Sequence, residues 1–153
     1  TNLIKNRKKL QEKLQAQMLT KPVETELPSL DNELVNQLHK TIETNLAQQE
    51  FGLDELADEL FMSRSTLYRK IVALTGLPPK KFIQIYRLKR SVEMMLEDSR
   101  NITELASDVG FSSAAYFAKC FKEKYNQSPS EFMNRLKRKR IEGNSKQNRS
   151  PMP

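Results

Sequence analysis

The chain contains two copies of one sequence pattern, and this repeat limits the possible folds more than any other feature. The segment 56–60 (Leu-Ala-Asp-Glu-Leu) matches the segment 105–109 (Leu-Ala-Ser-Asp-Val) at an offset of 49 residues. At an offset of 50, four further positions match: Leu67, Arg69, Ile71 and Gly76 against Phe117, Lys119, Phe121 and Asn126. Each copy predicts a short helix, a tight turn and a longer helix with basic outward positions. This is the layout of a helix-turn-helix, whose second helix can enter a major groove of DNA.

The rest of the chain also predicts helices, so we expect an all-α fold. Only four glycines occur among 153 residues, and no stretch shows the period-two alternation of a strand. Before the first copy, four apolar residues recur every four positions, as in an amphipathic helix: Leu34, Leu38, Ile42 and Leu46. Between the copies we expect a connecting helix from Pro79 to Leu96, with these residues inward: Phe82, Ile85, Leu88, Val92, Met95 and Leu96.

Polar residues at the expected helix ends support these boundaries. Ser63 can cap the second helix of the first copy, and Gly76 suits the turn after it. Asn101 with Glu104 resembles a capping box, and the run Ser128-Pro129-Ser130-Glu131 is a strong helix start. We therefore expect a linking helix and linker over 1–30, a first helix-turn-helix subdomain over 31–77, a connecting helix over 78–98, a second subdomain over 99–138 and a disordered tail over 139–153.

Charge is distributed unevenly along the chain. The net charge is +7 at pH 7, but residues 31–62 alone carry −7 and residues 63–138 carry +8. From Leu60 to Val92 there is no aspartate or glutamate, although eight basic residues fall in that window. Such a window indicates a surface for a polyanion. An ordinary solvated basic face is the alternative interpretation.

The composition argues against several classes of site. The single cysteine, Cys120, rules out a disulfide framework and any multi-cysteine zinc site. The single histidine, His39, argues against a histidine-based catalytic triad. No apolar run approaches the roughly 18 residues of a membrane span. We therefore expect no cofactor, no metal and no membrane contact. The chain begins at Thr1 rather than methionine, which predicts that it is a fragment of a longer protein.

Three motifs in the second copy carry a family resemblance: Ile102-x-x-Leu105-Ala106-x-x-Val109-Gly110-Phe111, Tyr116-Phe117-x-Lys119-x-Phe121-Lys122, and Ser128-Pro129-x-x-Phe132. The first copy carries Leu56-Ala57, the run from Met62 to Lys70, and Thr75-Gly76-Leu77. On these motifs, residues 31–138 resemble the DNA-binding domain of the AraC/XylS family of bacterial transcription regulators. Two positions depart from the family pattern. Asn126 stands where glycine is usual, and Met133 stands where arginine is common, so one phosphate contact is expected to be missing.

A narrower resemblance concerns the context of this domain. The segment from Met62 to Gly76, preceded by the helix expected over 4–19, is similar to the output domains of hybrid two-component regulators. In those proteins a receiver domain precedes a linking helix and then this domain. The resemblance implies a cytoplasmic protein that is regulated by a domain absent from this chain. It also implies RNA polymerase as a partner and leaves open a homodimer of the full-length protein.

Helical periodicity separates buried from outward positions in the first recognition helix. With Leu67, Ile71 and Leu74 inward, the outward positions include Val72 and the residues to which the resemblance also points. The candidates for reading bases there are Arg64, Ser65, Thr66, Tyr68 and Arg69. Arg69 is the strongest, because arginine can make a bidentate contact to guanine. A phosphate contact or a solvated charge is the alternative for Arg69, and packing against neighbours is the alternative for Tyr68.

The second recognition helix offers a different set of outward residues: Ala114, Ala115, Ala118 and Lys119. Alanines supply only apolar contact, as with thymine methyl groups. We therefore expect the first helix to give most of the specificity and Lys119 to add affinity. The candidates for binding the DNA backbone are Ser63, Lys70, Lys80, Lys81, Arg87, Ser112, Ser113 and Lys122. Serines at helix starts can bind phosphates. Some of the lysines and arginines could instead be merely solvated.

These observations predict a sequence-specific regulator that binds double-stranded DNA with two helices in successive major grooves. The family resemblance implies that it is an activator. One rival is a helical protein-interaction or dimerisation module, which would present an exposed apolar seam instead of two basic faces. The other rival is an enzyme acting on nucleic acid, which would need clustered metal-binding carboxylates or a positioned nucleophile. The acidic residues of 50–59 fall on helices that the pattern places away from DNA, so we expect no enzymatic activity.

Overall fold

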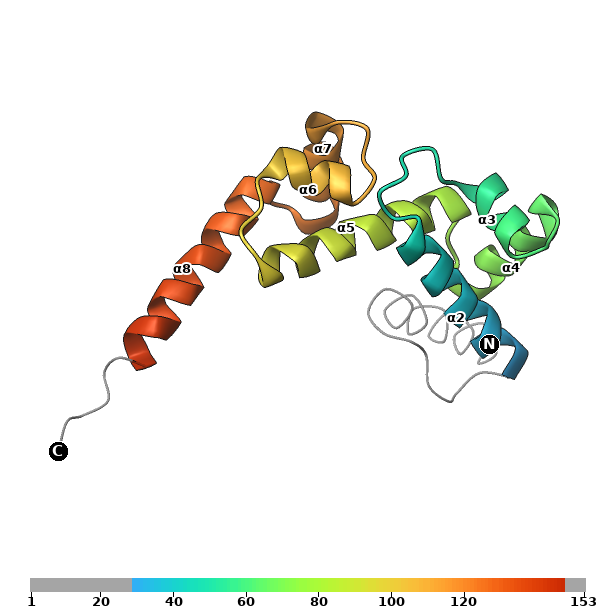
Figure 1. Cartoon of the computed structure of the whole chain (residues 1–153), viewed down its shortest axis with the longest axis horizontal. Helices are drawn as coiled ribbons and strands as arrows, with labels where there is room; N and C mark the ends of the chain where they lie inside the picture. Colours follow the sequence, from blue (N-terminus) through green and yellow to red (C-terminus); the bar gives the residue numbers. More distant parts are fainter. Residues whose placement is uncertain (1–28, 148–153) are drawn as a thin grey trace, which may run out of the picture. The chain divides into compact units, whose positions relative to one another are not determined.

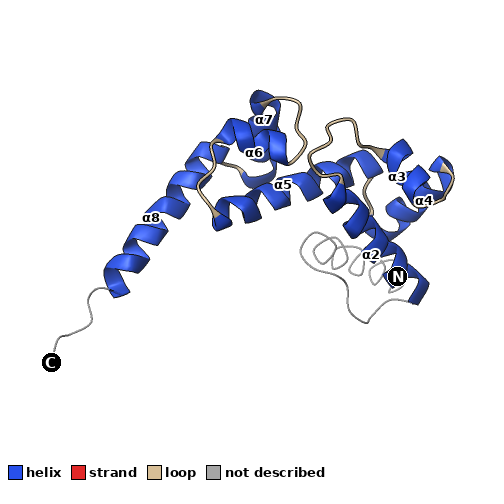
Figure 2. Cartoon of the chain, viewed as in Figure 1, coloured by secondary structure: helices blue, strands red, loops and turns tan. Residues whose placement is uncertain are grey.

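A computed structural model describes residues 29–147 of the chain (Figure 1). Within that range the secondary structure is entirely helical, as Figure 2 shows. The helices are α2 (Ser29–Thr44), α3 (Leu53–Glu59), α4 (Arg64–Thr75), α5 (Pro79–Glu97), α6 (Ile102–Asp108), α7 (Ala114–Tyr125) and α8 (Pro129–Gln147). The expected all-α fold with two helix-turn-helix pairs, α3–α4 and α6–α7, is confirmed. The linking helix expected near the N-terminus lies outside the described residues.

The chain divides into two compact units, and the border between them falls inside α5. The first unit extends to Arg90 and the second begins at Ser91. Each unit holds one helix-turn-helix pair and its own buried core. The first part of α5 therefore belongs to the first unit and its last part to the second.

The core of the first unit forms where α2 supplies an apolar stripe. Leu34, Leu38 and Ile42 are at most 5% exposed, as their spacing of four predicts. From α5, Phe82 and Tyr86 are each 1% exposed. The Tyr86 hydroxyl donates a hydrogen bond of 2.7 Å to a carboxylate oxygen of Glu43, so this buried ring keeps its polar end paired.

The core of the second unit is aromatic. Phe117 and Phe121 of α7 are fully buried. The Phe117 ring lies 5.2 Å from Phe111 and 5.7 Å from Phe121, and Phe121 lies 5.7 Å from Phe132 of α8. These separations are typical of edge-to-face or tilted aromatic pairs. A continuous row of rings therefore joins the turn before α7 to α8.

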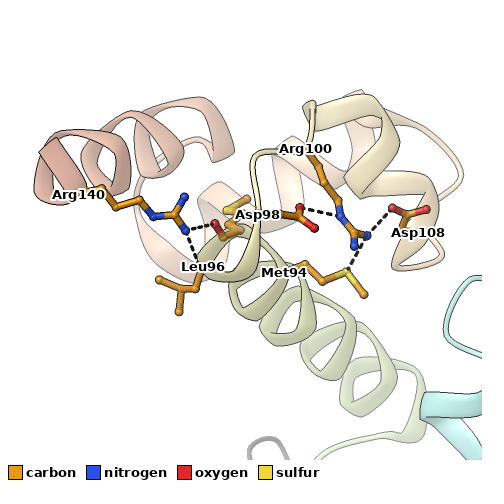
Figure 3. A network of polar contacts seen from close by, with 7 residues as sticks. Met94, Leu96, Asp98, Arg100, Asp108 and Arg140 are labelled. Atoms are coloured by element: carbon orange, nitrogen blue, oxygen red, sulfur yellow. Dashed lines mark hydrogen bonds and ion pairs between the residues drawn. The ribbon is translucent and has the colours of Figure 1, made fainter. Parts of the chain in front are cut away.

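Arg100 braces the connection between α5 and α6 in the second unit (Figure 3). Its Nε lies 2.9 Å from Asp98 Oδ1, and its Nη1 lies 2.9 Å from Asp108 Oδ2 and 3.8 Å from the sulfur of Met94. The hydrogen bonds with Asp98 and Asp108 raise the pKa of Arg100 above its ordinary value. One guanidinium thus ties the end of α5, the loop and α6 together.

The two helix-turn-helix turns use the same backbone motif. In the first, Met62 N–H donates to Ala57 C=O at 3.0 Å; in the second, Phe111 N–H donates to Ala106 C=O at 2.9 Å. This 6→1 bond belongs to the Schellman motif, which needs a left-handed residue at the turn. Gly110 takes that position with φ 83°, whereas the first copy places Phe61 there with φ 54°.

Four expectations about burial and order are wrong. Leu96 is 53% exposed, because it lies in the last turn of α5 on the side away from the core. Leu74, next to the end of α4, and Val92 of α5 are only partly buried. The helix α8 runs to Gln147, so residues 139–147 are not the disordered tail that their polarity suggested. Lysine, arginine and glutamate are strong helix formers, and they prolong a helix that Phe132 and Leu136 already hold on the core.

Candidate nucleic-acid interface

The outer face of α4 gathers most of the residues expected to read bases. Leu67 and Ile71 are fully buried and hold the helix on the core. On the opposite side, four exposed residues line an open hollow: Arg64, Ser65, Tyr68 and Arg69. The Tyr68 ring is 44% exposed, so packing against neighbours does not cover it. A hollow edged by two guanidinium groups and a phenol offers several donors to one ligand.

The start of α4 is fixed by its cap. Ser63 Oγ accepts a hydrogen bond from Thr66 N–H at 3.2 Å and donates one of 2.7 Å to Thr66 Oγ1. Ser63 is therefore the expected cap. Thr66 is half-buried and its hydroxyl belongs to this cap, so it sits apart from the four residues of the hollow.

An ion pair that the sequence reasoning missed engages Arg64. Its Nε lies 3.2 Å from Asp54 Oδ1 in the first turn of α3, and both side chains remain about two-thirds exposed. Such an exposed pair adds little stability, but it gives the Arg64 side chain a preferred direction. Arg69 is less constrained, since its Nε makes only a 3.4 Å hydrogen bond to Ser65 C=O.

The outer face of α7 is smaller and less polar. Ala115 and Lys119 are exposed, whereas Ala114 and Ala118 are partly buried. Tyr116 is 43% exposed, and its ring lies 5.8 Å from Phe111. Sequence reasoning treated Tyr116 only as part of a motif, although the offset of 50 residues places it opposite Thr66. The helix starts at a second serine cap, where Ser113 Oγ accepts from Tyr116 N–H at 3.0 Å.

The helix starts of α4 and α7 also differ from those of α3 and α6 in charge. Neither α4 nor α7 has an acidic residue in its first turn. In contrast, α3 has Asp54 and Glu55 there, and α6 has Glu104. Acidic side chains normally balance the partial positive charge of a helix N-terminus. At α4 and α7 no acidic side chain of the first turn balances that charge, so it is available to bind an external anion.

The residues expected to bind the DNA backbone fall into two groups. Seven are exposed or lie at a helix start: Ser63, Lys70, Lys80, Lys81, Ser112, Ser113 and Lys122. Arg87 is different, because its Nη2 donates to the carbonyls of Gln48 at 2.8 Å and Phe51 at 3.3 Å. Burial lowers the pKa of its guanidinium. Arg87 thus holds the loop before α3, and we do not count it among the phosphate-binding candidates.

One other basic residue of the acid-free window, Arg90, also faces inward. Arg90 forms a 2.9 Å ion pair with Glu43, and its side chain is only 22% exposed. Periodicity alone did not separate these structural arginines from the surface ones. Among the described residues, no group of histidine, cysteine, aspartate or glutamate side chains could hold a metal ion. None of the helices described between residues 29 and 147 is long and apolar enough to cross a membrane.

A family model described as a helix-turn-helix domain matches residues 56–135. Among curated proteins, the chain is 37% identical over 134 residues to histidine kinase P4 of Formosa agariphila, which covers 88% of this chain and 10% of that protein. It is 32% identical over 95 residues to the HTH-type transcriptional activator RhaS of Mannheimia succiniciproducens, covering 62% of this chain and 35% of RhaS. The chain thus spans well under half the length of either relative.

A solved structure has a similar fold. It is the C-terminal domain of the two-component response regulator YesN from Fusobacterium nucleatum, with 25% identity and a TM-score of 0.60. The match covers 69% of this chain and 99% of that domain.

Proposed function

The chain belongs to the AraC-type helix-turn-helix family and is a DNA-binding domain of a transcription regulator; on this premise we propose that it reads a bipartite DNA site with α4 and α7. The observation that carries the proposal is the outer face of α4, where Arg64, Ser65, Tyr68 and Arg69 line one open hollow. Hydrogen-bonding side chains that project from a recognition helix are what direct readout in a major groove requires.

The contribution proposed for α7 is mainly affinity. Its outer face offers methyl groups from Ala114, Ala115 and Ala118, and one charge from Lys119. Methyl groups can contact thymine methyls but cannot make hydrogen bonds to bases. The seven exposed or capping residues named above as backbone candidates would neutralise or bind phosphates around both helices.

The length of α5 supports a site with two parts. Its 19 residues correspond to about 28 Å of helix. Helices that read successive major grooves lie about 34 Å apart, which is one turn of DNA. A connector of this length with its flanking turns suits such a site, so a single chain would do what a dimer of single helix-turn-helix domains does elsewhere.

We further propose that the chain is the output domain of a longer two-component protein. The match to histidine kinase P4 covers 88% of this chain, far more than the helix-turn-helix core alone. The YesN domain of similar fold comes from a two-component response regulator. In this proposal residues 1–30 link the domain to a regulatory part, the full-length protein can dimerise, and the DNA-bound domain recruits RNA polymerase as an activator in the cytoplasm. Its action is noncovalent, and no reaction is assigned to this chain.

In-vitro selection from random duplex DNA, followed by sequencing of the bound pool, tests the bipartite site. We expect two short motifs whose centres lie about one helical turn apart. A single motif would mean that α7 only clamps the backbone. A pool without enrichment would contradict the proposal that this chain reads DNA by itself. A salt titration of the selected duplex separates a DNA reader from a protein-interaction module, because phosphate contacts make affinity fall steeply with salt.

A further inference from the structure

The second half of α8 carries a dense run of basic residues beyond the helix-turn-helix match. The family match ends at residue 135, and α8 continues to Gln147. Between Glu131 and Glu142 the helix holds no acidic residue but five exposed basic ones: Arg135, Lys137, Arg138, Lys139 and Arg140. This is the most concentrated positive charge in the described part of the second unit.

One member of the run anchors the helix. Arg140 donates from Nη2 to Met95 C=O at 3.2 Å and also to Leu96 C=O, as Figure 3 shows. Cationic side chains satisfy the last carbonyls of a helix well. Arg140 therefore fixes α8 to the end of α5 within the second unit.

Two of the remaining basic residues point to another side of the helix. At 3.6 residues per turn, Arg138 lies roughly opposite Arg140 and Lys139 about a quarter-turn away, whereas Lys137 lies on the same side as Arg140. Arg135 is engaged through a 3.2 Å hydrogen bond to Gln127. Among the described residues, none forms an ion pair or a side-chain hydrogen bond with the side chains of Lys137, Arg138 or Lys139.

This part of α8 gains little from packing. Ile141, the next apolar residue after Leu136, is 67% exposed. Adjacent like charges repel each other, and a helix without a packed face is only marginally stable. A polyanion alongside Arg138 and Lys139 would remove this repulsion between like charges. The same unit presents Lys119, Lys122 and the serines at the start of α7 as proposed phosphate contacts.

We propose that Arg138 and Lys139 bind phosphates of the duplex beside the α7 half of the site. The inference rests on the proposed function and extends it, because it assigns a sequence-independent contact to a part of the chain outside the helix-turn-helix core. Each occupied phosphate releases counterions and steepens the dependence of affinity on salt.

The test uses the whole chain and the double variant R138Q/K139Q, in which glutamine keeps a good helix former at both positions. The matched control K40Q/K124Q removes the same charge from exposed lysines on α2 and on the side of α7 away from Lys119. Affinity is measured over a range of salt on the selected duplex and on a scrambled one, with the helix content checked by circular dichroism. We expect the slope of log affinity against log salt to become shallower by about 2 for R138Q/K139Q, with equal weakening on both duplexes.

A second readout locates the contact. Extending the selected duplex by about one turn beyond the α7 half of the site should strengthen binding by the wild type and leave R138Q/K139Q unchanged. An unchanged salt slope, or the same loss in K40Q/K124Q, would overturn the inference; the first result would point to an acidic protein as the ligand of this face. Failure of the proposed function looks different, because the wild type would then not prefer the selected duplex over the scrambled one.

Discussion

In the first unit, α4 begins at the Ser63 cap and ends at Gly76, with φ 72°; in the second, α7 begins at the Ser113 cap and ends at Asn126, with φ 58°. Each serine accepts a hydrogen bond from the N–H three residues later. Asparagine tolerates a left-handed backbone, so Asn126 can take the place that glycine has in the first copy. The recognition helices of the two copies therefore start and end alike, at a serine cap and at a left-handed residue.

Their outer faces share almost nothing. The outer face of α4 carries two arginines, a serine and a tyrosine, whereas that of α7 carries three alanines, Lys119 and Tyr116. Residues that position a helix are therefore separable from residues that contact a ligand. We interpret the first copy as the reader of sequence and the second as a clamp, and the predictions below test this difference from the largest expected effect to the smallest.

Arg69→Ala should have the largest effect on recognition. A bidentate contact from arginine to guanine is worth about 1–3 kcal/mol, so affinity for the selected duplex should fall by about 5- to 150-fold. Affinity for a scrambled duplex should change little. Lys70→Ala is the matched control. Lys70 is expected to touch a phosphate, so its loss should lower the affinity for both duplexes equally. Equal losses on both duplexes for Arg69→Ala would reduce this residue to a phosphate contact.

The two turns should respond in opposite directions to substitution. Gly110→Ala should lower the free energy of unfolding by about 1–2 kcal/mol, since a left-handed backbone disfavours a side chain. Phe61→Gly should raise it by about 0.5–1 kcal/mol, because relief of the strain outweighs the extra freedom of glycine in the unfolded chain. The Phe61 ring is 96% exposed, so its removal sacrifices no packing. Urea denaturation measures both values, and a destabilised Phe61→Gly variant would mean that the ring has contacts in solution.

Lys119→Ala should weaken binding without changing sequence preference. If Lys119 touches one phosphate, the salt slope becomes shallower by about 1 and the selected motifs stay the same. Lys124→Ala, on the other side of α7, should leave the slope unchanged. A changed second motif after Lys119→Ala would contradict the clamp interpretation and make α7 a reader.

The smallest effect concerns pH. Glu55 caps α3 by accepting from Gly52 N–H at 2.9 Å, and hydrogen bonds from its own backbone and from Gly52 lower its pKa. Its contribution to stability is therefore full at neutral pH and is lost as the pH falls through the lowered value. The equivalent cap of α6 uses the amide oxygen of Asn101, which does not titrate. Glu55→Gln should make the melting temperature fall less steeply between about pH 6 and about pH 3. If the fall is unchanged, protonation of other carboxylates causes it.

Much of this architecture followed from the sequence, because each element was marked by local signals. The caps at Ser63, Asn101 and Ser128 start helices where expected, and the buried faces of α4 and α7 follow the helical period. The sequence did not predict which charged side chains make contacts inside the domain and which face the solvent. Arg87 and Arg69 look alike in sequence, yet one bonds to carbonyls of a loop and the other faces outward. That distinction depends on segments some 36–39 residues away, which local periodicity cannot register.

The Asp54–Arg64 pair was missed for the same reason, because an exposed ion pair does not alter the pattern of apolar residues. The helix extension to Gln147 was missed because polarity was equated with disorder. Which bases α4 selects remains a prediction, as does the role of each phosphate candidate.

The division of α4 into a buried side and an outer side affects how this domain can evolve. Leu67 and Ile71 hold the helix in place, and none of the four residues around the hollow contributes to that core. Mutation can therefore exchange those four residues freely while the domain continues to fold. Under the proposed reading of DNA by α4, a lineage that duplicates this gene would acquire a new set of target promoters in a few steps, with the folded scaffold inherited intact.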